Sequence, residues 1–214
     1  MTQLALVHPA PEESDDAQRR GDFDVIARMV EDGASVLDVG CGDGALISLL
    51  THACGARARG LERDKAKARY CVARGLSVVQ GDAESCLADY PSAAFDYVVF
   101  SHSFQCMARP RETLRQAGRV GEKVIVSIRN AAHWRDRLRL LSKGRLGASN
   151  APSWADGELA RACSVRDFAS LAREMRFTIE TAAPLSNGRA GAPFAKTLWR
   201  ANVFAEEAVF LLAP

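Results

Sequence analysis

Short apolar runs recur along the first two thirds of the chain, and polar segments with helical periodicity separate them. Five runs lie at Ser35–Val39, Ala58–Leu61, Leu76–Gln80, Phe95–Phe100 and Lys123–Ile128. They are continuously apolar rather than alternating, which is typical of strands buried on both faces of a parallel sheet. Strand and helix signals alternate at short spacing, so the pattern predicts a doubly wound α/β fold.

Helices are expected between these strands. Apolar residues from Phe23 to Val30 recur at helical spacing, and the segments that follow the first, second and fourth runs have helical patterns as well. These segments are Ala45–Thr51, Lys65–Arg74 and Pro110–Gly118.

The alternation of strand and helix signals is interrupted at about residues 132–163, where a basic amphipathic segment and a loop are inserted. Ser164 to Asp167 then has the pattern of a capping box that opens a helix. Phe177–Ala182 and Ala208–Leu212 are expected as the last two strands, with the glycine-containing loop Asn187–Pro193 between them. We therefore expect a flexible tail at residues 1–20 and one domain at residues 21–214.

Composition narrows the function classes. The chain has 214 residues and a net charge of +2, which is too small to indicate nucleic acid or a membrane as a general partner. No run approaches the roughly 20 apolar residues of a membrane span, and the N-terminus lacks the pattern of a signal peptide. A cytoplasmic protein is expected. The six cysteines match no zinc-site spacing, so no metal is expected.

The glycine-rich turn Gly40–Gly44 follows the first strand, where open α/β sheets bind their ligands. Glycine spacing alone would also suit a dinucleotide. Asp38 and Asp43, however, place two carboxylates beside the next helix N-terminus, and these would repel a pyrophosphate. S-adenosylmethionine (SAM) has no phosphate and carries a sulfonium and an ammonium group. Charge therefore favours SAM.

Two further acids end the next two strands. Glu62 is placed to bind two ribose hydroxyls, and Asp82 is placed to accept a hydrogen bond from an adenine amino group. A single acid in a loop is usually only solvated, but acids at consecutive strand ends favour one ligand site. Ser101 and His102 follow the fourth strand at the same edge.

The segments VLDVGCGDG, GLERD, QGDAE and FDYVVF resemble the class I SAM-dependent methyltransferases, over roughly residues 22–128. The resemblance implies a Rossmann-like sandwich whose mostly parallel, seven-stranded sheet has a final antiparallel strand. It implies SAM as cofactor and S-adenosylhomocysteine (SAH) as product or bound form. The implied cofactor-binding residues are Asp38, Gly40, Cys41, Gly42, Glu62, Arg63, Asp82, Ala83 and Ser101.

A longer stretch, from Tyr70 through VIVSIRNAAHWRDRLRLLSKGRLG, resembles the MetW family of methionine biosynthesis proteins, as does the C-terminal NVFAEEAVFLL. The resemblance implies a role in methionine biosynthesis with a homoserine O-acyltransferase as partner. The chain departs from the family pattern after Trp154: Ala155 stands where the family has an aromatic residue, and Gly157–Arg161 replaces the usual histidine-containing stretch.

The sequence evidence for catalytic residues is weaker than the evidence for cofactor-binding residues. The Asn/Asp-Pro-Pro-aromatic motif of many N-methyltransferases is replaced by Ser101-His-Ser-Phe-Gln105. His102 is a candidate general base because the ordinary pKa of histidine lies near neutrality, but it would equally serve as part of a pocket wall. Cys41 and Cys106 lie near the loop, without a sequence signal of nucleophilic cysteine.

The segment from His133 to Gly147 is basic, and Trp134, Leu138 and Leu141 form one apolar stripe along it. The stripe suits a helix packed on the sheet, a partner-docking helix or lid, or a nucleic-acid or membrane surface. Three functions therefore stay open: a MetW-type protein with an acyltransferase partner, a small-molecule methyltransferase, and, least favoured, a nucleic-acid methyltransferase.

Overall fold

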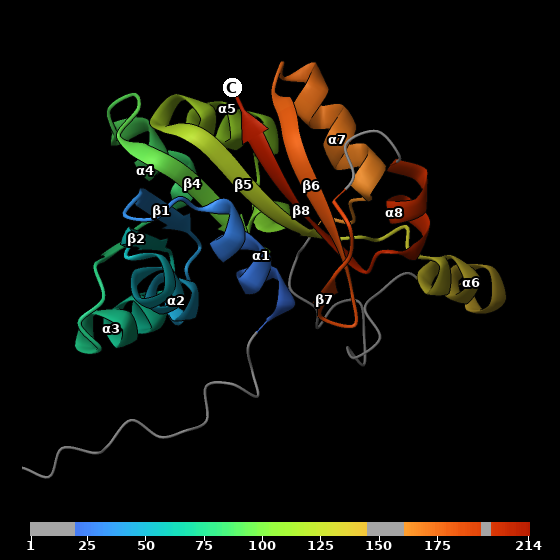
Figure 1. The fold of residues 1–214 in the computed structure, drawn as a ribbon, viewed down its shortest axis with the longest axis horizontal. Coiled ribbons are helices and arrows are strands. Elements are labelled where there is room, and N and C mark those ends of the chain that lie inside the picture. The colour runs from blue at the N-terminus through green and yellow to red at the C-terminus, as the bar shows by residue number, and fades with distance from the viewer. Residues whose placement is uncertain (1–19, 145–160, 194–197) are drawn as a thin grey trace, which may run out of the picture.

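The computed structural model describes residues 20–144, 161–193 and 198–214 (Figure 1). Its strands form one sheet in the order β3-β2-β1-β4-β5-β8-β6-β7. The strands are β1 (Ser35–Val39), β2 (Arg57–Glu62), β3 (Val78–Gln80), β4 (Phe95–Ser101), β5 (Gly121–Arg129), β6 (Thr178–Ser186), β7 (Arg189–Ala190) and β8 (Glu207–Ala213).

Helices cover both faces of this sheet. One apolar cluster includes side chains of α4, α5, α7 and α8, and the other includes side chains of α1 and α2. The helices are α1 (Gly21–Met29), α2 (Ala45–Cys54), α3 (Lys65–Ala73), α4 (Ala83–Asp89), the 3₁₀ turn η1 (Phe104–Cys106), α5 (Pro110–Val120), α6 (Trp134–Lys143), α7 (Val165–Glu174) and α8 (Leu198–Phe204).

The topology gathers several strand ends at one edge. Strands β3, β2, β1, β4 and β5 are parallel, and β8 runs antiparallel between β5 and β6. The start of β8 and the end of β6 therefore lie at the same edge as the carboxyl ends of β1, β4 and β5. Arg129 at the end of β5 is registered opposite Glu207 at the start of β8.

The predicted α/β class and the mostly parallel sheet are confirmed, but the expected count of seven strands is wrong. Residues 187–193 were expected to be a loop only. Asn187 and Gly188 both adopt positive φ, +50° and +69°. This conformation forms a tight hairpin turn, so the two residues of β7 pair with the end of β6.

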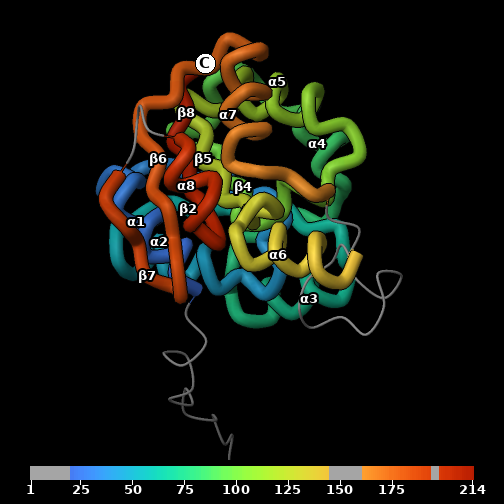
Figure 2. The backbone as a smooth tube through the Cα atoms, turned by 90° about the vertical axis from the view of Figure 1, so that its right-hand side faces the viewer, coloured from blue at the N-terminus to red at the C-terminus, as the bar shows by residue number. Residues whose placement is uncertain are grey.

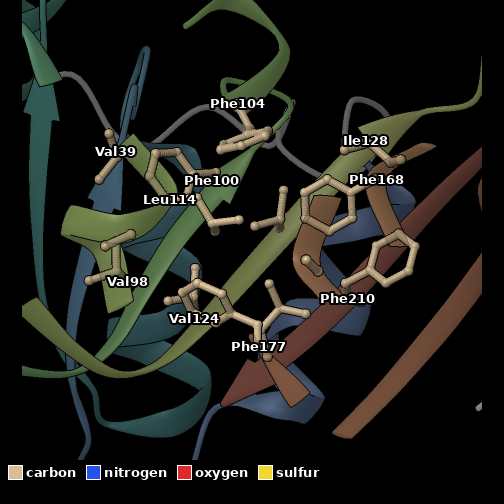
Figure 3. Close-up of a cluster of buried hydrophobic side chains, with 14 of the residues drawn as sticks. Val39, Val98, Phe100, Phe104, Leu114, Val124, Ile128, Phe168, Phe177 and Phe210 are labelled. Carbon is tan, nitrogen blue, oxygen red and sulfur yellow. The ribbon is translucent and has the colours of Figure 1, made fainter. Parts of the chain in front are cut away.

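The larger core cluster lies between β4, β5 and β8 on one side and α5 and α7 on the other (Figure 3). Aromatic rings connect its parts: the Phe168 centroid lies 5.5 Å from Phe104 and 4.8 Å from Phe210. The capping box predicted at Ser164 is confirmed, since its hydroxyl accepts from the Asp167 N–H and the Asp167 carboxylate accepts from the Ser164 N–H. This cap begins α7 where Phe168 enters the core.

Helix α6 stands away from the sheet at the right-hand margin of Figure 1 and faces the viewer in Figure 2. None of its residues is buried. Its apolar stripe is exposed, at 43% for Trp134, 56% for Leu138 and 85% for Leu141. Inward packing of this stripe, one of the alternatives drawn from the sequence, is wrong.

Two sequence predictions concern residues that the structure does not describe. The predicted tail, apart from Arg20, and the departure after Trp154 lie outside the described residues. Within the described ranges, no helix is long and apolar enough to cross a membrane.

Candidate functional site

The glycine-rich turn between β1 and α2 depends on left-handed backbone conformations. Gly40, Gly42 and Gly44 have φ of +76°, +59° and +79°, which side chains other than glycine rarely adopt. A Cβ on Gly40 would lie 2.6 Å from the Cβ of Ser103, whereas a Cβ on Gly42 would meet no atom within 4 Å. The loop thus has a packed side at Gly40 and an open side at Gly42, where a ligand can approach the backbone closely.

Asp38 is the penultimate residue of β1, directly before this turn, and is 1% exposed. Burial raises its pKa to about 7, against the opposing effect of the Arg20 charge, and nearby carboxylates add to the rise. Its Oδ1 atom is buried and has no hydrogen-bond partner among the residues that the structure describes. A buried carboxylate oxygen without a donor is costly, and a cationic ligand group would supply that donor.

Glu62 ends β2 and reaches across to the same turn. Its Oε2 accepts from the Gly42 N–H and its Oε1 accepts from the Asp64 N–H, both at 2.8 Å. Each carboxylate oxygen has a second acceptor position, so these bonds leave capacity for two hydroxyl donors. Glu62 therefore fixes the loop, a role that its sequence position did not reveal.

The acid that follows β3 differs from Asp38 and Glu62, because it is exposed and caps a helix. Asp82 is exposed, and its Oδ1 caps α4 by accepting from the Glu84 N–H at 2.8 Å. Ala83 begins that helix, and Arg63 is exposed after β2. Cys41 is buried in the turn, and burial raises the pKa of its thiol, which disfavours the thiolate that a nucleophile needs.

A second polar cluster joins distant parts of the chain beside the end of β4. Arg20 donates twice to the fully buried Asp22, at 3.1 and 2.8 Å, and Ser101 donates to the same carboxylate at 2.7 Å. Burial alone would raise the pKa of Asp22, but nearby charges, Arg20 foremost, and the Ser101 hydrogen bond hold it below its ordinary value. Asp22 thereby attaches the N-terminus of α1 to the ligand edge of the sheet.

His102 adjoins this cluster in a strained conformation, with φ of +55°. Its Nε2 lies 3.2 Å from an oxygen of Glu207 and 3.9 Å from one of Asp22. Neither contact has hydrogen-bond geometry, so Nε2 is a buried atom without a hydrogen-bond partner in the described part of the chain. Sequence reasoning selected Ser101 and His102 but missed Arg20, Asp22 and Glu207.

Asp22, His102 and Glu207 also present ligand atoms within 4.8 Å of one another, close enough for a metal ion. Arg20 already neutralises Asp22, however, and its guanidinium would repel an added cation. The expectation that the chain holds no metal stays a prediction.

Solved structures resemble this fold over most of its length. A SAM-dependent methyltransferase from Thermotoga maritima has a TM-score of 0.66 and 15% identity, covering 90% of this chain and 87% of that one. A SAM-dependent methyltransferase from Archaeoglobus fulgidus has a TM-score of 0.61 and 13% identity, covering 90% and 94%. The cyclase SpnF has a TM-score of 0.63 and 17% identity, covering 90% and 80%. The fold is therefore the Rossmann-like fold of the SAM-dependent methyltransferases.

Sequence comparison is more specific. A bifunctional methionine biosynthesis protein MetXA/MetW from Rhodopirellula baltica is 28% identical over 132 residues, which are 58% of this chain and 21% of that protein. The matched region is thus about a fifth of the relative's length. The family model described as methionine biosynthesis protein MetW matches residues 20–212. The chain belongs to the MetW family of methionine biosynthesis proteins.

Proposed function

We propose that the chain binds SAM and SAH at the turn between β1 and α2. The observation that carries this proposal is the buried Oδ1 of Asp38, which lacks a donor beside the open side of a glycine turn. A cofactor with an ammonium group and no phosphate suits this negatively charged edge, whereas a pyrophosphate would be repelled.

Each residue has a distinct part in holding the cofactor. Asp38 would accept from the ammonium group, and Glu62 from the ribose hydroxyls through the acceptor positions that its backbone bonds leave free. Asp82 would accept from the adenine amino group through the oxygen that does not cap α4. Further residues would line the site, namely Gly40, Cys41, Gly42, Arg63, Ala83 and Ser101. When bound, SAM supplies an electrophilic methyl group on its sulfonium.

Replacing Glu62 by alanine should weaken SAH binding by about 1.5–3 kcal/mol, the range for hydrogen bonds to a charged group. Calorimetry measures this directly. Because Glu62 also fixes the turn, thermal unfolding of the variant must be recorded alongside.

Asp64→Ala is the matched control, since Asp64 caps α3 through the N–H groups of Ala66 and Lys67. This control should lower the stability slightly, through loss of the helix cap, and leave SAH affinity unchanged. Unchanged affinity in Glu62→Ala, or stabilisation of the parent protein by NAD and not by SAH, would contradict the proposal.

We further propose that the protein acts in the cytoplasm, in methionine biosynthesis, with a homoserine O-acyltransferase as its partner. The bifunctional relative whose name joins MetXA and MetW supports such an association. A small-molecule methyltransferase is the second candidate, favoured by the unbonded Nε2 of His102 at the ligand edge. The proposal is tested by co-purification from native cells with an acyltransferase assay.

Helix α6 is the proposed docking surface for this partner. It leaves Trp134, Leu138 and Leu141 exposed in a row, and tryptophan and arginine are favoured anchors of protein interfaces. The Arg135 side chain is 61% exposed, and its Nη1 lies 3.9 Å from an oxygen of Glu206, the residue just before β8, so this contact connects α6 loosely to the ligand edge.

Reversing two charges on α6, Arg135→Glu with Arg139→Glu, should weaken the complex with the acyltransferase mainly through a slower association rate and a changed salt dependence. The Arg135 reversal should alter the free energy of unfolding by no more than about 0.5 kcal/mol, as at other exposed sites. The Arg139 reversal should cost more, because half-buried Arg139 pairs with Asp136 at 3.1 Å. Surface plasmon resonance at two salt concentrations measures the effect.

The control is the double reversal Lys67→Glu with Arg69→Glu on the exposed side of α3. Equal weakening by both pairs would assign the effect to net charge, and no weakening by the α6 pair would exclude this helix as the docking surface. SAH affinity should be the same in the parent protein and in both double-reversal variants.

A further inference from the structure

Besides the proposed cofactor site at the glycine turn, a second pocket opens at the ligand edge of the sheet, beside β4, β5 and β8. It has a volume of about 180 Å³, and its walls include Arg20, His102, Arg129, Leu185, Glu206 and Glu207. Four strand ends contribute to it: the end of β4 just before His102, the ends of β5 and β6, and the start of β8. It is smaller than the roughly 300–1,000 Å³ pockets of drug-sized ligands, so its occupant is small.

Two of the charged groups in these walls are already matched. Arg20 donates twice to Asp22, and a carboxylate oxygen of Glu206 accepts from the Asn187 N–H at 2.8 Å. Fewer charged groups of the pocket walls are therefore available to a ligand than the number of charged residues there suggests.

The other two charged residues of the pocket walls are Arg129 and Glu207. They are registered opposite each other on β5 and β8, where opposite charges commonly pair, yet no ion pair joins them in the part of the chain that the structure describes. The guanidinium of Arg129 has no hydrogen bond or ion pair with any described residue. Glu207 lies 3.2 Å from the His102 Nε2, in a contact without hydrogen-bond geometry. An exposed arginine, a glutamate and a histidine, namely Arg129, Glu207 and His102, thus line the same small space.

We infer that this pocket binds a small zwitterion, an α-amino acid, whose carboxylate pairs with Arg129 and whose ammonium group pairs with Glu207. A ligand with a single charge would leave one of these two groups unmatched, and a cost follows when a charged group is desolvated without a partner. Among the described residues, the walls hold no phenyl, phenol or indole ring that would stack on a nucleobase. The inference deepens the proposed function, because it names the class of ligand that lies beside the cofactor site.

Calorimetry with matched probes tests the inference on the full chain, free and saturated with SAH. L-Methionine and L-homoserine are the zwitterions, N-acetyl-L-methionine lacks the cation, and L-methionine methyl ester lacks the anion. Both zwitterions, or the one whose side chain fits, should bind in the free and SAH-loaded protein. Each single-charge analogue of methionine should bind about tenfold or more weakly, as expected for loss of one charged hydrogen bond.

Two near-isosteric variants locate the site. Arg129→Gln and Glu207→Gln should each weaken amino-acid binding by about tenfold or more and leave SAH affinity unchanged. Arg69→Gln, an exposed arginine on α3, is the control and should change neither affinity.

Three results would overturn the inference: no amino-acid binding at millimolar concentration, equal binding of the analogues, or loss of amino-acid binding when SAH is present. The last result would assign the pocket to the amino-acid end of the cofactor itself. Failure of the parent protein to bind SAH would instead remove the proposed cofactor site, and amino-acid binding by the free protein would still support the second pocket.

Discussion

The affinity of the protein for SAH should rise about tenfold for each pH unit as the pH approaches 7 from below, and should level off above it. Burial raises the pKa of Asp38 to about 7, so the carboxyl is neutral at lower pH. The ammonium group of SAH favours the ionised form, and binding therefore releases a proton from Asp38. Replacing Asp38 by asparagine should abolish this slope and leave the weak, low-pH affinity at all pH values.

The same group makes an opposite contribution to stability without ligand. The pKa of Asp38 is raised from an ordinary 3.8, so folding favours its protonated form. That contribution is fully present below about pH 4 and is lost as the pH rises through about 7. The free protein should lose stability across this window relative to Asp38→Asn, as measured by urea unfolding at a series of pH values.

Calorimetry at several pH values in buffers of different ionisation enthalpy measures both the slope and the proton release. Glu62→Gln serves as the control, since it lowers affinity at the same edge without removing the titrating group. A slope that persists in Asp38→Asn would assign the linkage to another residue, and a flat profile in the parent protein would show that Asp38 does not face the bound ligand.

The strands of this fold could be predicted because their signal is local. Continuous apolar runs such as Phe95–Phe100 and Lys123–Ile128 form strands that are largely buried on both faces, and their short length favours a strand over a buried helix. Helices α4 and α8 were missed because each has only seven residues, and α4 begins at an acid that sequence reasoning assigned to a ligand. An aspartate that caps a helix and one that binds an adenine have the same sequence signature at a strand end.

The glycine turn and its acids were found for the same local reason, since Asp38, Gly40 and Gly42 are neighbours in sequence. The second cluster was not found, because it exists only through tertiary contacts. Asp22 and Ser101 are 79 residues apart, and nothing near Asp22 distinguishes it from an ordinary acid in the first turn of a helix. Its burial was the missing information, and only the position of α1 against β4 supplies it.

Replacing Asn130 by alanine should lower the free energy of unfolding by about 3 kcal/mol or more. Asn130 follows β5 and is 3% exposed. Its Nδ2 donates to the carbonyls of Ala201, Asn202 and Ala205, at 3.4, 3.0 and 2.7 Å, near the end of α8. Its Oδ1 accepts from the N–H groups of Ala132 and Val165, at 3.1 and 3.3 Å.

One side chain thus satisfies backbone groups from three segments, and each buried group left without a partner costs about 1–3 kcal/mol. Because the same side chain holds the segment after Arg129 against α7 and α8, the loss should also loosen the wall of the second pocket. Asn202→Ala is the control: its Oδ1 accepts a single bond, from the exposed Arg166 N–H, so it should cost about 1 kcal/mol. Urea unfolding of the parent protein and both variants measures these changes. Equal losses of unfolding free energy in Asn130→Ala and Asn202→Ala would show that Asn130 does not join the three segments.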